Sequence, residues 1–343
     1  MLSQEKCAYF LVSNPPEHSV IPYSILITLL STIVNFIGCY VIIRKSKKET
    51  NLFRFTLFGN LFTLWLSQGY WAISMNTMPL FPFPALYSSN FLNNLVSTYT
   101  AFRVWLILLS FFVLFLIGQL IVRHRMVVRP ESFFNFPSWF YIGFLTIGWL
   151  TLLPFLLTVW KYCDSTDLEK VQYIEENFPG CEAVTDLQGV LIITNVHALY
   201  ILLGLMVVTG VGALGVYFIS SGLMLFELSK QTRKMSKTNF NHQRKIVVDT
   251  TIQIVIKSIF ISTWPFWIVI SYFVSPQMDT RIISTLINSL FVCAPIPGTI
   301  SMLILNSSYR RFVTENILRR KTSAVIPSRY ALPLPADSKY QFH

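Results

Sequence analysis

Two long stretches of this chain carry no charged side chain. The 48 residues between Arg54 and Arg103, and the 40 from Leu187 to Phe226, contain no Asp, Glu, Lys or Arg. About 18 mostly apolar residues already suffice for a helix that crosses a bilayer. Only 13% of the 343 residues are charged, whereas soluble proteins use roughly 25%. We therefore expect a membrane protein, which excludes an ordinary soluble enzyme and a disordered chain.

Hydropathy windows of about 20 residues predict seven membrane-spanning helices. They are expected at residues 20–43, 55–75, 91–122, 138–160, 190–226, 246–275 and 282–305. Their apolar residues are continuous and do not alternate, which argues against a membrane β-barrel. The expected fold is an all-α bundle of seven transmembrane helices, flanked by residues 1–19 and 306–343.

The basic residues predict the orientation of these helices. Of the 27 Lys and Arg residues, 21 fall in connections on one side, four fall on the other, and Arg103 and Lys257 lie within spans. Lys and Arg collect on the cytoplasmic side of membrane proteins. The amino terminus is therefore expected outside and the carboxy terminus in the cytoplasm. The net charge of +11 is spread over short loops, which favours contacts with lipid head groups or a cytoplasmic partner over nucleic-acid binding.

No motif of the sequence predicts an enzyme, a cofactor or a metal site. The pattern Gly210-x-Gly212-x-x-Gly215 resembles a dinucleotide-binding loop, but it lies inside an expected span with no strand before it. We expect these glycines to let helices pack closely instead. Cys and His are dispersed without the spacing of metal ligands. No carboxylate lies well inside a span, which disfavours an ion-coupled transporter.

Charged and aromatic residues of the spans offer a candidate ligand site. Arg103 lies in the outer half of the third span, where it can face a cavity or extend to the membrane surface. For Lys257 in the sixth span, surface contact or an internal hydrogen bond is expected. Aromatic residues crowd the outer half of the bundle, as in a site for a small, partly apolar molecule. An interfacial aromatic belt has the same composition. The candidate ligand residues are Arg103, Trp71, Tyr87, Tyr99 and Trp267.

Four short motifs occur in the order found in one receptor family. They are Gly38-Cys-Tyr40-Val-Ile42-Ile-Arg-Lys45, Pro84-Ala85-Leu86-Tyr87, Ser236-Lys237-Thr238 followed by Gln243 and Gln253, and Thr299-Ile300-Ser-Met302-Leu303-Ile-Leu-Asn306-Ser-Ser-Tyr309-Arg310. The set resembles the nematode serpentine chemoreceptors of the Str superfamily, class H in particular, with classes I and Str as near alternatives. This resemblance implies a chemosensory G-protein-coupled receptor, a small-molecule ligand and a location in the plasma membrane of sensory cilia.

The resemblance also implies residues for G-protein coupling and a disulfide. Arg125 matches the arginine that the family has at the inner end of the third span, although the neighbouring Glu and Tyr are lost. The expected coupling residues are Arg125, Arg244, Lys245, Tyr309 and Arg310. An amino-terminal cysteine and one that follows a proline favour a Cys7–Cys181 bond, with Cys163–Cys181 as the alternative.

Two other functions remain open from the sequence. A seven-span ligand-gated channel or transporter would conduct or carry solutes with no G protein present. A folded but silent relative would act as a structural partner.

Overall fold

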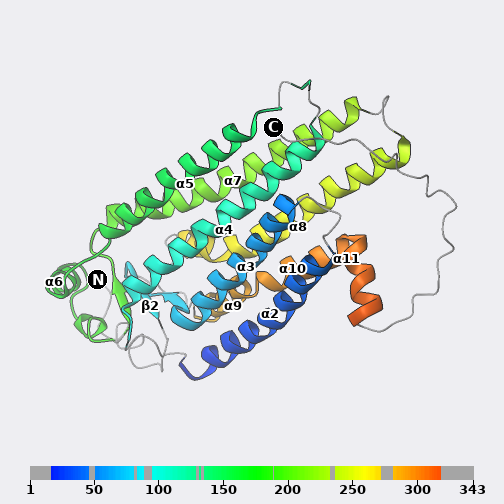
Figure 1. Ribbon diagram of the computed structural model, residues 1–343. Coiled ribbons are helices and arrows are strands. Elements are labelled where there is room, and N and C mark those ends of the chain that lie inside the picture. Colours follow the sequence, from blue (N-terminus) through cyan, green and yellow to red (C-terminus); the bar gives the residue numbers. More distant parts are fainter. Residues whose placement is uncertain are drawn as a thin grey trace.

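Long helices that run side by side make up the protein (Figure 1). The computed structural model describes residues 17–45, 51–80, 83–88, 95–128, 131–132, 135–187, 189–231, 236–271 and 281–317. The long helices are α2 (Glu17–Lys45), α3 (Asn51–Ser74), α4 (Thr98–Val127), α5 (Ser138–Lys161), α7 (Val196–Lys230) and α8 (Lys237–Ser271). Shorter elements are α6 (Asp167–Asn177), η3 (Glu182–Val184), α9 (Arg281–Val292), α10 (Pro295–Leu305), α11 (Ser307–Phe312) and the π-helical η4 (Val313–Ile317).

Most of the long helices are able to cross a membrane. By length and composition α2, α4, α5, α7 and α8 qualify, and α9 with α10 forms a sixth span that is bent by 42°. The remaining long helix, α3, has 24 residues, or about 36 Å at 1.5 Å per residue, which exceeds the roughly 30 Å of the hydrocarbon core. Its mean hydropathy is lowered by buried polar residues such as Asn60, Ser67 and Gln68. Within the described residues, each of the seven expected segments thus overlaps a helix or a helix pair.

Several helix boundaries differ from the expected ones. α8, for example, begins at Lys237 and not at residue 246. Three of the differences have a local cause. The third helix begins at Thr98 and not at residue 91, because Ser97 caps it by accepting a hydrogen bond from the Thr100 amide. The fifth helix was expected from residue 190 but begins at Val196, after a cap by Asn195. The last segment is interrupted at Cys293 and Ala294, directly before Pro295, because proline lacks the amide hydrogen that would continue the helix.

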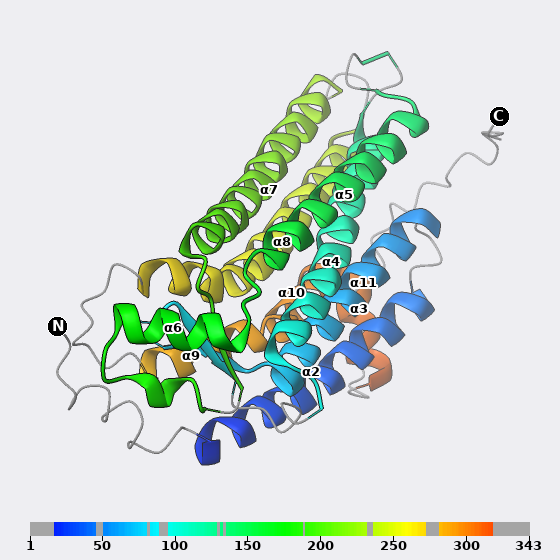
Figure 2. The same ribbon diagram turned by 90° about the vertical axis from the view of Figure 1, so that its left-hand side faces the viewer.

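A small antiparallel sheet covers one end of the bundle, which we call the sheet end. Its strands are β1 (Thr77–Pro79), β2 (Ala85–Ser88) and β3 (Val190–Ile192), in the order β1-β2-β3. The register pairs Met78 with Tyr87 and Tyr87 with Val190. The sheet therefore ties the α3–α4 connection to the segment before α7. Figure 1 shows α6 at this same end and α11 at the opposite end, and in Figure 2 the sheet end faces the viewer.

Aromatic side chains fill the bundle beneath the sheet. Trp71 is fully buried, and its ring centroid lies 4.4 Å from that of Trp264 and 4.7 Å from that of Trp105. Phe102 stacks on Trp160 at 4.3 Å. The Trp71 indole Nε1 donates a hydrogen bond to Asn288 Oδ1 (2.8 Å). We call these rings, together with Phe291, the aromatic cluster. It closes the interior of the bundle at the sheet end.

The outer faces of the peripheral helices are apolar. On α5, Trp139, Ile142, Ile147 and Leu150 expose 56–73% of their surface. Such a surface would be costly in water and is suited to lipid. α5 lies on one side of the bundle and α2 on the other, with α3 and α4 between them (Figure 1).

Candidate functional site

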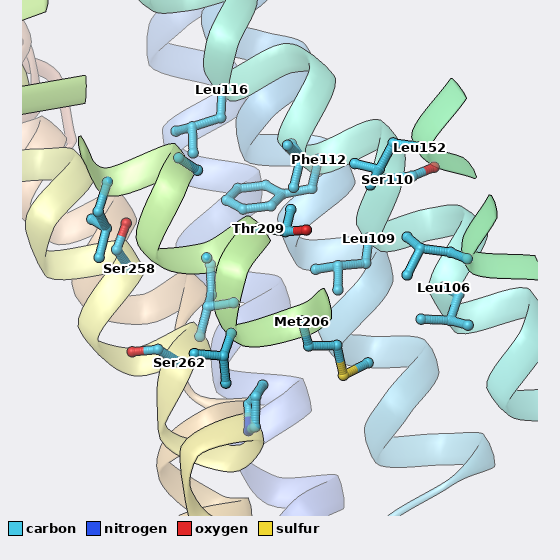
Figure 3. A pocket seen from close by; sticks show the side chains of 18 of the residues that line it. Leu106, Leu109, Ser110, Phe112, Leu116, Leu152, Met206, Thr209, Ser258 and Ser262 are labelled. Atoms are coloured by element: carbon cyan, nitrogen blue, oxygen red, sulfur yellow. The ribbon is translucent and has the colours of Figure 1, made fainter. Parts of the chain in front are cut away.

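A cavity of about 170 Å³ lies between α4, α5, α7 and α8. Figure 3 shows its lining side chains, which come from all four helices. On α4 the lining runs from Trp105 to Leu116, and on α7 it runs from Met206 to Tyr217. No Asp, Glu, Lys, Arg or His is among the described residues that line it. The cavity can therefore hold a small apolar molecule but offers no charge to an ionic one.

Small side chains on α7 leave room for this cavity. Thr209, Gly210 and Ala213 line it, and a Cβ added at Gly210 would meet no atom within 4 Å. The same is true of Gly212 and Gly215. The expectation that these glycines bring helices into close contact is therefore wrong. Gly210 instead keeps the cavity open.

The polar atoms of the cavity fall into two groups. The hydroxyls of Ser110 and Ser262 donate to carbonyls of their own helices, at 2.7 and 3.1 Å. In contrast, the indole Nε1 of Trp105 and the hydroxyl of Tyr217 are buried without a hydrogen-bond partner. Trp105 is the lining residue of α4 nearest the sheet end, and Tyr217 is the lining residue of α7 farthest from it. Trp105 and Tyr217 thus lie at the two ends of a mainly apolar cavity lining.

None of the five candidate ligand residues from the sequence lines this cavity. Trp71 belongs to the aromatic cluster. Trp267 donates from Nε1 to Ser284 Oγ (2.9 Å), and Tyr99 stacks on Trp160 at 5.2 Å. Tyr87 is buried in β2, and Arg103 is exposed on the outside of α4. Sequence reasoning missed Trp105, which lines the cavity and lies two residues after Arg103. The helical period could have indicated it, because it places Trp105 on the buried face of α4.

At the opposite end of the bundle, Arg123 and not Arg125 is turned towards the interior. The Arg123 guanidinium carbon lies 3.6 Å from the centroid of the Phe53 ring on α3, a close cation–π contact. Arg125 is exposed, and its guanidinium carbon is 5.9 Å from the ring of Tyr141 on α5. The signal was present in the sequence, because Arg123 continues the buried face of Gln119 and Leu120 at helical spacing.

The other expected coupling residues differ in exposure. Arg244, Lys245 and Arg310 are exposed at this end, and Arg310 Nη1 donates to the Ile304 carbonyl (3.2 Å). Tyr309 is only 2% exposed and packs with Phe53 and Val41 in a core cluster. The side chain of Tyr309 therefore holds α11 against the bundle and does not present a surface to a partner.

Lys257 makes an internal hydrogen bond, one of the two expected arrangements. Its side chain is 1% exposed, and Nζ donates to Asn60 Oδ1 on α3 at 2.5 Å. The stem crosses Gly298 of α10, where an added Cβ would lie 2.8 Å from Lys257 Cγ. Nearby, Thr299 Oγ1 donates to Asn35 Oδ1 on α2 (2.8 Å). Buried polar contacts thus join α2, α3, α8 and α10.

The two described cysteines of the sheet end differ in their bonding. Cys181 is disulfide-bonded, and Cys163 carries a free, buried thiol. The alternative bond Cys163–Cys181 is therefore wrong, because Cys163 packs in the core among apolar neighbours. The preferred bond Cys7–Cys181 stays a prediction, since Cys7 lies outside the described residues.

Comparison with known families identifies the chain. Residues 12–313 match the family model of the serpentine type 7TM GPCR chemoreceptor Sri. No curated protein matches the chain. The match supports the expectation of a nematode serpentine chemoreceptor. It does not confirm the resemblance to class H. The match covers the helices from α2 to α11 and indicates a multi-pass membrane receptor. The chain belongs to the serpentine type 7TM GPCR chemoreceptor Sri family.

Proposed function

We propose that this protein is a chemosensory receptor that binds a small molecule between α4, α5, α7 and α8 and signals to a heterotrimeric G protein. The observation that carries the proposal is the apolar cavity of about 170 Å³ at mid-depth of the bundle. An apolar protein cavity of about 150 Å³ stays dry and binds a molecule such as benzene. A plasma-membrane location in sensory cilia is part of the proposal, by resemblance to the family.

The charges of the bundle support one orientation in the membrane. Among the described residues, Arg44, Arg54, Lys230 and Lys237 join Arg123 at the end opposite the sheet. The positive-inside rule supports placing this end in the cytoplasm and the sheet outside. A G protein and anionic lipid head groups would then meet the basic end.

Tyr217 offers a physical link between the cavity and the cytoplasmic end. It lines the cavity, and it also packs in a core cluster with Leu120, Met224, Val247 and Ile254. Beyond the last turn of α7, Gln231 Nε2 donates a hydrogen bond to the carbonyl of Val127 (2.8 Å), which joins the end of α7 to the end of α4. A ligand that shifts Tyr217 would change the packing of α4, α7 and α8 at this end.

Opening of the cytoplasmic end is the conformational step of this mechanism. In the structure α4, α7 and α8 are packed together there, which corresponds to a closed arrangement. A ligand favours signalling only if it binds the open arrangement more tightly than the closed one. Pro265 of α8 lines the cavity, and its missing amide hydrogen makes that turn a natural place for α8 to bend.

A matched pair of glycine variants tests the cavity as the ligand site. Gly210→Leu would fill part of the cavity, whereas Gly212→Leu would place the same side chain outside it, since Gly212 is exposed and does not line the cavity. Both positions have space for a Cβ, so both variants should fold. The measurement is a calcium or cyclic-nucleotide response to pooled small molecules in cells that express each variant.

We expect Gly210→Leu to lower the response at least tenfold at equal surface level and Gly212→Leu to leave it within about twofold. Equal responses from both variants would place the ligand elsewhere. A ligand-evoked current from purified protein in liposomes, without a G protein, would favour the channel or transporter instead.

A further inference from the structure

We propose that the cavity opens sideways into the hydrocarbon region of the bilayer, beside Phe266 of α8, and that it takes a small, uncharged, apolar molecule dissolved there. The proposal rests on the cavity being the ligand site of the proposed function. It adds the chemical class of the ligand and the route by which the ligand arrives.

The lining determines the chemical class. No Asp, Glu, Lys, Arg or His is among the described residues that line the cavity, and the hydroxyls of Ser110 and Ser262 already donate to carbonyls of their own helices. An ionised molecule would therefore lose its hydration and gain no opposite charge in exchange. The volume of about 170 Å³ has room for a molecule of the size of benzene, which binds in an apolar cavity of about 150 Å³.

The end of the cavity towards the sheet is closed. Trp105 lies at this end and is fully buried. Between the cavity and the sheet lies a void of only about 20 Å³, bordered by Phe102, Trp160 and Trp264. Such a void has room for about one water molecule. Among the described residues, these rings leave no passage for a molecule as large as benzene.

The opposite end of the cavity is closed as well. Tyr217 and Ile254 line the cavity there and are only 3% and 1% exposed. Both pack with Leu120 and Met224 in one core cluster. A ligand therefore does not reach the cavity along the axis of the bundle from this end either.

The cavity is nevertheless not fully enclosed, and Phe266 marks its open side. Phe266 lines the cavity and is 42% exposed. Ile259 and Ile270 lie seven residues before and four residues after it, on the same face of α8. Both expose more than half of their surface and do not line the cavity. Phe266 therefore lies where the cavity meets the outer, apolar face of α8.

The residues of α7 indicate the depth of the opening. Gly210 and Tyr217 both line the cavity and lie seven residues apart, on the same face of the helix. Gly210 is exposed, whereas Tyr217 is buried. Open space thus reaches the middle of α7 and ends before Tyr217. This depth belongs to the hydrocarbon core of a bilayer, where an ionised molecule is poorly soluble. The route and the lining therefore select the same class of molecule.

The test uses a phosphatidylcholine whose acyl chain carries a photoreactive diazirine. This lipid stays in the bilayer, so it can label the lining only through a side opening. The purified full-length receptor is irradiated in nanodiscs that contain the lipid, and mass spectrometry locates the label. We expect the lining residues Leu109 and Leu116 of α4 to carry at least one tenth of the label found on the outer face of α5, at Ile142 and Ile147. Label on α5 alone would overturn the side opening.

Variants then test the position of the opening. Gly210→Leu should lower the label on the α4 lining at least fivefold, because the added side chain fills the cavity. The label on α5 should stay within about twofold, which shows that the variant is folded. Gly212→Leu, on the exposed face of α7, is the matched control and should change neither label. Phe266→Ala should widen the opening and raise the label on the lining at least twofold. An unchanged label in Phe266→Ala would overturn the placement beside Phe266.

Competition tests the class of the ligand. Excess n-hexane should lower the label on the α4 lining at least fivefold, whereas hexanoate at the same concentration should leave it within about twofold. A label that persists in excess n-hexane would identify the acyl chain of a lipid as the occupant and overturn the small-molecule ligand. Displacement by hexanoate would overturn the uncharged class.

The labelling test is independent of signalling. A labelled lining in a receptor whose response in cells is unaffected by Gly210→Leu would refute the cavity as the site of the signalling ligand and leave the side opening intact. An unlabelled lining in a receptor whose response is lost in Gly210→Leu would refute the side opening and leave the proposed function intact.

Discussion

The ammonium group of Lys257 lies within the bundle and donates a hydrogen bond to Asn60 Oδ1 at 2.5 Å. No described carboxylate forms an ion pair with it. A buried charge that loses its partner typically costs 3–5 kcal/mol, whereas a buried neutral acceptor that loses its donor costs about 1–3 kcal/mol. We therefore expect stability to be more sensitive to replacement of Asn60 on α3 than to replacement of Lys257 on α8.

We expect unequal effects when the two sides of this contact are changed. Asn60→Leu should lower the free energy of unfolding by about 3 kcal/mol, because Lys257 would stay buried without a partner. Lys257→Met should cost less, about 1–2 kcal/mol, because it removes the charge and leaves only the neutral Asn60 Oδ1 without a donor. Thermal unfolding of the purified protein in detergent measures both. A loss of stability in Lys257→Met as large as that in Asn60→Leu would contradict this explanation.

Gly298 is required by the side chain of Lys257. A Cβ at residue 298 would lie 2.8 Å from Lys257 Cγ, so Gly298→Ala should cost about 1–3 kcal/mol. In a Lys257→Ala background the same change should cost less than about 1 kcal/mol. The control is Gly222→Ala on α7, where no neighbouring atom lies within 4 Å and alanine favours the helix. Thermal unfolding of the four variants gives the coupling, and equal costs in both backgrounds would refute the steric cause.

Arg123 and Arg125 provide a test of the coupling site. Arg123 contacts Phe53 inside the bundle, whereas Arg125 is exposed. We expect Arg123→Ala to reduce G-protein signalling at least tenfold and Arg125→Ala to change it less than about twofold, at matched surface levels. The readout is the second-messenger response per receptor on the cell surface. The opposite ranking would favour the family alignment, which points to Arg125, over the packing.

The thiol chemistry of the sheet end should reflect burial and pairing. Burial raises the pKa of Cys163 to about 11, so at pH 8 only about one thiol in a thousand is the reactive thiolate. We expect an alkylating reagent at pH 8 to leave Cys163 unmodified in the folded protein and to modify it after unfolding. Non-reduced peptide mapping should link Cys181 to Cys7. Rapid labelling of Cys163 in the folded protein, or a free Cys181, would contradict these expectations.

The orientation can be tested with epitopes at the two termini. An epitope after Lys6 should be stained on intact cells, and one after His343 only after permeabilisation, because Lys and Arg gather at the end opposite the sheet. Microscopy of the two tagged proteins, with surface biotinylation as a control for expression, measures this. The reverse pattern would invert the bundle and place the G-protein site outside the cell.

The helical spans could be predicted because a bilayer requires long apolar runs, and such runs are visible in a single sequence. The strands could not be predicted. Ala85 pairs with Ile192 across more than 100 residues, and strands of three or four residues have no periodicity to detect. The break at Cys293 and Ala294 had a visible cause in Pro295, but the spacing alone permitted a continuous helix.

The candidate site was harder to predict than the fold. Aromatic content identified the outer half of the bundle, yet Trp71 and Trp267 are used for packing and hydrogen bonds there. The cavity exists because no side chain of a neighbouring helix lies close to Gly210. The sequence cannot show this, because a glycine can face either a tightly packed helix or open space. The inward turn of Arg123 could have been read from the helical period. Its contact with Phe53 could not, because that contact depends on how α3 and α4 pack.

The contact between Lys257 and Asn60 also bears on how the protein is made. A lysine in the middle of a span costs about 2.5–3.5 kcal/mol during insertion into the membrane. Asn60 precedes Lys257 by 197 residues, so at 5–20 residues per second α3 is synthesised about 10–40 s before α8. The acceptor for the lysine is thus already part of the nascent chain when α8 leaves the ribosome. Lys257 can therefore find its acceptor on insertion only if α3 stays beside the insertion site until α8 arrives.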